Sequence, residues 1–169
     1  HHGKHRSAAA VAVACVLNGS LRPERAESVL ETFGTGENYK GLPWLVLDYP
    51  RLFNKEDVFA IRTLFWWGNF FSVTLHLSGK YKVQYEKRII DSFELFRADG
   101  FSFCINEDQW QHHFEASNYT PLSDFDPSAF QEKIQNGSFV KLAKKIPLEQ
   151  WSGVEKKLLK IFSQLINTL

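Results

Sequence analysis

The sequence predicts an α+β fold: a single domain, spanning residues 1–169, in which a small mixed or antiparallel sheet packs against several helices. Hydrophobic residues make up 44% of the 169-residue chain and aromatic residues 15%, which is enough apolar material for one core. Strand and helix patterns occur in separate segments and alternate clearly only once, over residues 70–105. A doubly wound parallel sheet would need that alternation along most of the chain.

Residues 54–67 are predicted to form a helix at the centre of the domain. The Asn54 side chain can cap the first turn, and Asp57 suits the positive end of a helix. Apolar residues then occupy most of the helical circumference, so we expect burial on several sides. These residues are Val58, Phe59, Ile61, Leu64, Phe65, Trp66 and Trp67.

Residues 70–78 alternate as a half-buried strand does. The apolar face carries Phe71, Val73, Leu75 and Leu77. The polar face carries Ser72, Thr74, His76 and Ser78. A helix over residues 81–98 and a short strand over 101–105 are expected to follow.

The chain ends in an amphipathic helix, predicted for residues 152–167, whose apolar face includes Val154, Leu158, Ile161 and Leu165. Asp126 and Pro127 predict the capped start of another helix that reaches Gln135. The segment 139–148 fits a strand or a helix equally well. The other expected elements are helices at 7–17 and 20–34, a polar loop at 35–41, a strand or extended segment at 42–49 and a short helix within 106–120.

Arg62, Trp66, Trp67 and Asn69 form the most unusual local cluster. On a helix, residues four apart share a face, so the Arg62 guanidinium could lie over the Trp66 indole. The functional interpretation is a pocket wall in which Arg62 binds an anion and a tryptophan stacks on a planar ligand. The structural alternative is an ordinary core helix with an arginine that reaches solvent.

His76 is the candidate catalytic residue, with Ser72 and Thr74 beside it on the polar strand face. If this face lines a cleft, His76 could act as a general base, because its ordinary pKa is close to neutrality. If the face meets solvent, His76 is a surface histidine. The chain has no Gly-x-Ser-x-Gly turn that would strengthen a catalytic role.

No metal, cofactor or nucleic-acid site is predicted. His112 and His113 lie near Asp108 and Glu115, but adjacent histidines point apart, whereas zinc needs three or four convergent ligands. The chain has no phosphate-binding loop and no nucleic-acid-binding motif. Its 20 Lys and Arg residues nearly balance its 19 Asp and Glu residues, so its overall charge does not favour a polyanionic partner.

Cys15 and Cys104 are far apart in apolar surroundings, which favours free thiols and a cytoplasmic location. Lys4-His5-Arg6 before the apolar run 8–17 resembles an export signal, but that run is too short to span a bilayer, and no membrane partner is expected. The chain contains no Met. We therefore expect that an N-terminal part of the native polypeptide precedes His1, or that His1-His2 is a tag remnant.

Two functional hypotheses follow. The first is a non-enzymatic intracellular domain that binds a small molecule or a protein partner through an aromatic-rich pocket. The second is a cofactor-independent hydrolase or transferase with His76 as general base and Arg62 as the anion-binding group. The enzyme requires His76 within about 3 Å of a carboxylate or a substrate group, inside a concave pocket. The sequence does not indicate an oligomeric state.

Overall fold

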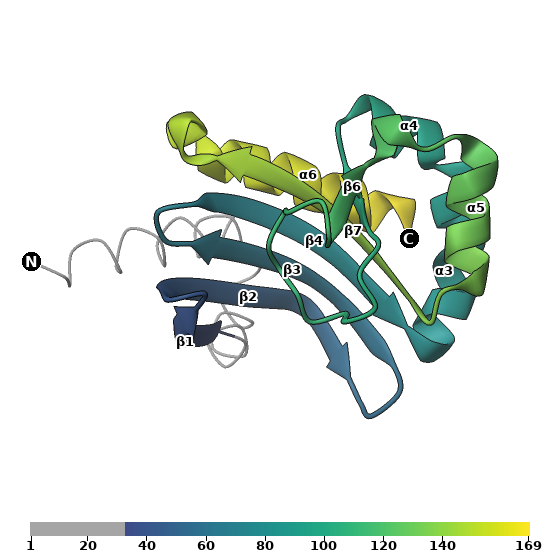
Figure 1. The fold of residues 1–169 in the computed structure, drawn as a ribbon, viewed down its shortest axis with the longest axis horizontal. Coiled ribbons are helices and arrows are strands. Elements are labelled where there is room, and N and C mark those ends of the chain that lie inside the picture. Colours follow the sequence, from purple (N-terminus) through teal and green to yellow (C-terminus); the bar gives the residue numbers. More distant parts are fainter. Residues whose placement is uncertain (1–32) are drawn as a thin grey trace, which may run out of the picture.

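The computed structural model describes residues 33–169, which form one antiparallel sheet with helices (Figure 1). The sheet has seven strands in the order β1-β2-β3-β4-β7-β5-β6. The strands are β1 (Phe33–Tyr39), β2 (Leu42–Phe53), β3 (Val58–Trp66), β4 (Phe70–Ser78), β5 (Ser102–Cys104), β6 (Tyr119–Pro121) and β7 (Phe139–Pro147). The α-helices are α3 (Gly79–Asp91), α4 (Phe93–Ala98), α5 (Pro127–Asn136) and α6 (Val154–Thr168). This architecture confirms the predicted α+β class.

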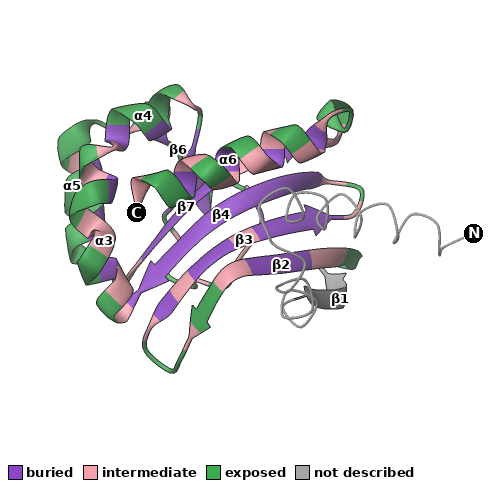
Figure 2. Cartoon of the chain, turned by 180° about the vertical axis from the view of Figure 1, so that it is seen from behind, coloured by how far each residue is buried: buried purple, intermediate pink, exposed green. Residues whose placement is uncertain are grey.

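The helices cover one face of the sheet. Figure 2 shows α6 running across that face, with α3, α4 and α5 gathered at one side. The apolar side chains of β4 point into this helical layer and are fully buried: Phe71, Val73, Leu75 and Leu77. The main core therefore lies between the helices and the centre of the sheet. No helix among residues 33–169 is long and apolar enough to cross a membrane.

The predicted helix over residues 54–67 is wrong, because this segment is β3 and the turn before it. Strand β3 is covered on both faces, so its apolar residues form a nearly continuous run from which periodicity cannot distinguish a strand from a helix. Asn54 does act as a cap, but of a turn: its Oδ1 accepts from the backbone N–H groups of Glu56 (2.9 Å) and Asp57 (2.6 Å). The same side-chain chemistry serves helix starts and hairpin turns.

Strand β4 confirms the predicted strand at 70–78, but the prediction that one of its faces stays open is wrong. All nine residues of the strand are buried. Its neighbours β3 and β7 pair along its whole length, and a long loop, residues 105–118, crosses the sheet face opposite the helices (Figure 1). We call residues 105–118 the covering loop.

The covering loop contains no helix, so the short helix predicted within 106–120 is wrong. Strand β2 continues past the predicted end of the extended segment at Tyr49, through a cis Tyr49–Pro50 bond and a register shift between Asp48 and Arg51. The shift accommodates a proline, which cannot donate to the sheet ladder. Residues 139–147 are a strand, which resolves the ambiguous segment.

At the N-terminal side, the predicted polar loop 35–41 is mostly strand β1, which pairs with β2. The predicted helix 7–17 and most of the predicted helix 20–34 lie outside the described residues, and residues 33 and 34 belong to β1.

Three helical predictions are confirmed. The segment 81–98 is helical, divided at Ser92 into α3 and α4. Helix α5 begins as expected, with the Asp126 carboxylate accepting from the Ala129 backbone N–H at 2.8 Å. The C-terminal helix α6 buries the predicted apolar stripe: Val154, Leu158, Ile161 and Leu165.

Candidate functional site

The sheet face under the covering loop carries a group of buried polar side chains from four strands. Sheet register sets Asp48 opposite Arg62, Arg62 opposite Thr74, and His76 opposite Lys141. Because residues directly opposite each other in a sheet share a face, these side chains all point toward the covering loop. We call them the polar sheet face: Asp48, Arg62, Ser72, Thr74, His76 and Lys141.

Arg62 is held in a bidentate ion pair. Its Nε and Nη2 donate to the two carboxylate oxygens of Asp48, each at 2.7 Å, and the two side chains are only 13% and 6% exposed. Its Nη1 donates to Nε2 of His112 in the covering loop at 2.9 Å. The guanidinium charge is therefore already matched inside the protein, although anion binding was predicted for it.

His112 accepts this bond as a neutral imidazole. Burial, followed by the positive charges of Arg62 and Lys141, lowers the pKa of His112 to about 2. Because Arg62 can only donate, Nε2 of His112 carries no proton and the other ring nitrogen does. His112 therefore attaches the covering loop to β3.

His76, the predicted general base, faces an amide. Its Nε2 donates to the side-chain oxygen of Gln109 in the covering loop at 2.7 Å. Trp110 and Phe139 pack their rings against the imidazole, at 5.2 and 6.0 Å between centroids. Burial and then the charge on Lys141 lower the pKa of His76 to about 3. At neutral pH His76 is thus an uncharged and weakly basic hydrogen-bond donor.

Lys141 of β7 completes the attachment of the covering loop. Its side-chain ammonium donates to the backbone carbonyls of Gln109 (2.8 Å) and Gln111 (2.6 Å), and the residue is only 1% exposed. Burial lowers its pKa to about 8, so the amine is still mostly protonated at neutral pH. A charged donor on a central strand therefore binds the loop directly.

The remaining predicted site residues are only partly brought together. Ser72 and Thr74 lie buried on the polar sheet face with Arg62 and His76. Trp66 shares the face of Arg62, since residues four apart also share a face in a strand, and it packs edge-on against Phe70 at the apolar end of that face. Trp67 packs with Phe65 on the opposite face, and Asn69 lies in the β3–β4 turn. The two tryptophans therefore do not line one pocket.

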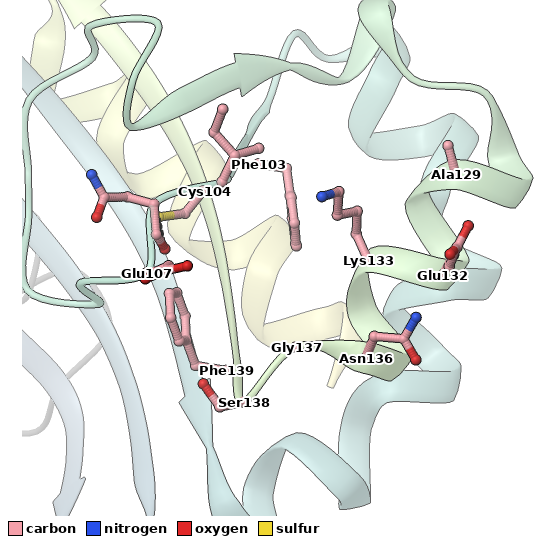
Figure 3. Close-up of a pocket in the computed structure, with 12 residues that line it drawn as sticks. Phe103, Cys104, Glu107, Ala129, Glu132, Lys133, Asn136, Gly137, Ser138 and Phe139 are labelled. Atoms are coloured by element: carbon pink, nitrogen blue, oxygen red, sulfur yellow. Dashed lines mark hydrogen bonds between the residues drawn. The ribbon is translucent and has the colours of Figure 1, made fainter.

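A pocket lies elsewhere, between β5 with the first residues of the covering loop, α5, and the start of β7 (Figure 3). Its volume is about 480 Å³. Its lining includes the rings of Phe103 and Phe139, the buried thiol of Cys104, and the charged side chains of Glu107, Glu132 and Lys133. We call it the β5–α5 pocket. None of the site residues predicted from the sequence belongs to it.

Two opposite charges face this pocket from different walls. Figure 3 shows the Glu107 carboxylate beside the Phe139 ring, and the Lys133 ammonium reaching from α5 toward Phe103. Both residues are exposed, and neither forms an ion pair with another residue of the described chain. Glu132 also lines the pocket, from the same face of α5 as Lys133 and Ala129. The pocket lining thus carries two carboxylates, from Glu107 and Glu132, and the ammonium group of Lys133.

The pocket adjoins the polar sheet face. Phe139 lines the pocket and also packs against His76, while Ile105, Asn106 and Glu107 line the pocket and begin the covering loop. The Cys104 thiol contacts the side-chain oxygen of Asn118 at 3.4 Å, and burial raises its pKa. This thiol is consequently a protonated, weakly reactive part of the pocket floor.

The sequence predicted the strand and the helix that line this pocket, but not that they lie next to each other. Phe103 was placed on a predicted strand, and Lys133 on a helix started by Asp126-Pro127. Their approach depends on β5 pairing with β7, a contact between residues about forty positions apart, seen in the register of Phe103 with Leu142. No local pattern encodes such a pairing.

Within residues 33–169, no three His, Cys, Asp or Glu side chains gather in a way that could hold a metal ion. Comparison of the chain with protein-family models, curated proteins and solved structures gave no significant match.

Proposed function

We propose that this protein is a non-enzymatic domain that binds a small molecule in the β5–α5 pocket. The observation that carries the proposal is the pocket itself, with a volume of about 480 Å³. Small-molecule sites typically measure about 300–1,000 Å³ and combine apolar walls with a few polar groups. Phe103 and Phe139 supply aromatic walls, and Glu107 and Lys133 supply groups that can orient a ligand.

The charged side chains of the polar sheet face support this choice, because they already have partners within the protein. Arg62 is committed to Asp48 and His112, and Lys141 to the covering loop. A ligand on this face would have to break charged hydrogen bonds between buried groups, each of which contributes about 1.5–3 kcal/mol. A ligand in the β5–α5 pocket breaks no such bond.

Binding is also favoured over the hydrolase or transferase alternative. A general base works best when its pKa is near the working pH, whereas the pKa of His76 is lowered to about 3. The partner of His76 is the Gln109 amide, not a carboxylate. An amide neither holds a proton nor stabilises an imidazolium as a carboxylate does.

The proposal is tested by screening a fragment library against ¹⁵N-labelled protein. We expect weak ligands that shift the amide signals around Phe103, Lys133 and Phe139. The variant Ala129→Leu places three extra carbons on the pocket wall and should reduce these shifts by filling the space. Ala98→Leu, at the exposed end of α4, is the matched control and should bind as the wild type does.

The result that would overturn the proposal is equally specific. Fragments that perturb other regions only, or that bind Ala129→Leu as well as wild type, would show that the β5–α5 pocket is not a binding site. The proposal would also be overturned if the protein stayed folded and no fragment in the library shifted its amide signals.

A further inference from the structure

We infer that the ligand of the β5–α5 pocket is a zwitterion with an apolar body, in the size range of an apolar amino acid or dipeptide with free amino and carboxyl groups. This inference rests on the proposed function and specifies its ligand class. It follows from the arrangement of charge and aromatic surface around the pocket.

The charges of Glu107 and Lys133 select the two ends of the ligand. They approach the pocket from different walls, one from the covering loop and one from α5. Neither is neutralised by an ion pair within the described chain. An ammonium group would be attracted to Glu107 and a carboxylate to Lys133, so a molecule bearing both groups gains two favourable interactions.

Ligands with only one charge fit less well. An anion would be attracted by Lys133 but repelled by Glu107 and Glu132, and a cation would be attracted by the two carboxylates but repelled by Lys133. These interactions partly cancel for a singly charged molecule, whereas a zwitterion can place each of its charges near the opposite charge of the lining. Specificity of this kind comes from repulsion of the wrong ligand as well as from attraction of the right one.

The rings of Phe103 and Phe139 specify the body between the charges. Both rings line the pocket (Figure 3), and Phe139 is the more exposed of the two. Phe103 is 3% exposed and packs edge-on with Phe125 and Phe130, at 5.9 and 5.5 Å between centroids, so its position is fixed by the core. An aromatic or aliphatic side chain can pack against these rings without rearranging the protein.

The test compares four matched probes by NMR titration: L-phenylalanine, its N-acetyl derivative, its amide, and the neutral N-acetyl amide. L-alanyl-L-phenylalanine extends the separation between the two charges. L-phenylalanine and L-alanyl-L-phenylalanine are the two zwitterions. We expect one of them to bind more tightly than the three probes that lack one or both charges. Because both charged residues are exposed, blocking one ligand charge should raise Kd by only about two- to fivefold.

Charge reversal gives a sharper readout than affinity alone. Glu107→Lys should shift the preference toward the N-acetyl anion, and Lys133→Glu should shift it toward the cationic amide. The controls Glu149→Lys and Lys156→Glu make the same charge changes at exposed positions outside the pocket and should keep the preference for the zwitterion.

The outcomes separate this inference from the proposed function. Equal binding of all probes at the pocket amides would overturn the zwitterion inference while leaving a ligand-binding pocket. Preferences that do not change in Glu107→Lys and Lys133→Glu would overturn it as well. If none of these probes binds, the inference fails, and the fragment screen with Ala129→Leu decides the proposed function independently.

Discussion

Replacing Arg62 tests whether the polar sheet face is a structural network. In Arg62→Met the side chain keeps much of its length but loses its charge, so Asp48 remains buried without its partner. Removal of one member of a buried ion pair typically costs about 3–5 kcal/mol. The side chains of Asp48 and Arg62 are at most 13% exposed and are joined by two hydrogen bonds of 2.7 Å. We therefore expect Arg62→Met to lower the free energy of unfolding by about 3–5 kcal/mol.

For a chain of this size, each kcal/mol shifts Tm by about 2–4 °C, so Arg62→Met should lower Tm by roughly 10 °C. The measurement is thermal unfolding followed by circular dichroism, together with urea unfolding at 25 °C. Asp48→Leu combined with Arg62→Met removes both charges. The double variant should recover part of the lost stability, because no unpaired buried charge remains.

The matched control is Arg97→Met. Arg97 also forms an ion pair, with Glu94 at 3.4 Å, but the two side chains are 43% and 66% exposed. Exposed pairs contribute about 0–1 kcal/mol, so Tm should change by only a few degrees. If Arg62→Met were as mild as Arg97→Met, the polar sheet face would not be structural, and Arg62 would be available to a ligand.

Two further predictions concern the attachment of the covering loop. Lys141→Met should leave the global fold intact but increase hydrogen exchange across residues 105–118, because the carbonyls of Gln109 and Gln111 lose their charged donor; unchanged exchange would contradict the role of Lys141. Since the pKa values of His76 and His112 in the folded protein, about 3 and about 2, lie below the ordinary 6.5, the unfolded chain binds protons first as the pH falls. The free energy of unfolding, measured in urea, should therefore decrease from about pH 6.5 toward pH 3, by up to about 1.4 kcal/mol per pH unit for each histidine, and the double variant His76→Gln/His112→Gln should flatten this dependence.

The sequence predicted the α+β class and most of the elements after residue 70, because their patterns are local. Strand β4 alternates, Asp126 and Pro127 start α5, and α6 has a continuous apolar stripe. The helix predicted over residues 54–67 was wrong because β3 is buried on both faces, and such burial removes the alternation that identifies a strand. Its Asn54 cap supported the wrong element, since the same residue type stabilises a tight turn.

Several residues of the polar sheet face were already candidate site residues in the sequence. The enzyme hypothesis combines Arg62 with His76, and the hairpin register of β3 and β4 places Arg62 directly opposite Thr74. The sequence could not reveal that the covering loop closes this face, since residues 106–120 carry no periodic pattern. Nor could it reveal Lys141, which lies opposite His76 across the sheet and is buried under the covering loop.

The attachment of the covering loop through Lys141 has a consequence for the order in which the chain folds. The loop is synthesised before its anchor, because residues 105–118 precede β7 in the chain. Docking must wait until β7 has paired with β4, a step that joins the Lys141 region to residues more than sixty positions earlier. Such distant pairings slow folding. On the ribosome, the imidazoles and the arginine of the sheet stay in contact with water until β7 has emerged.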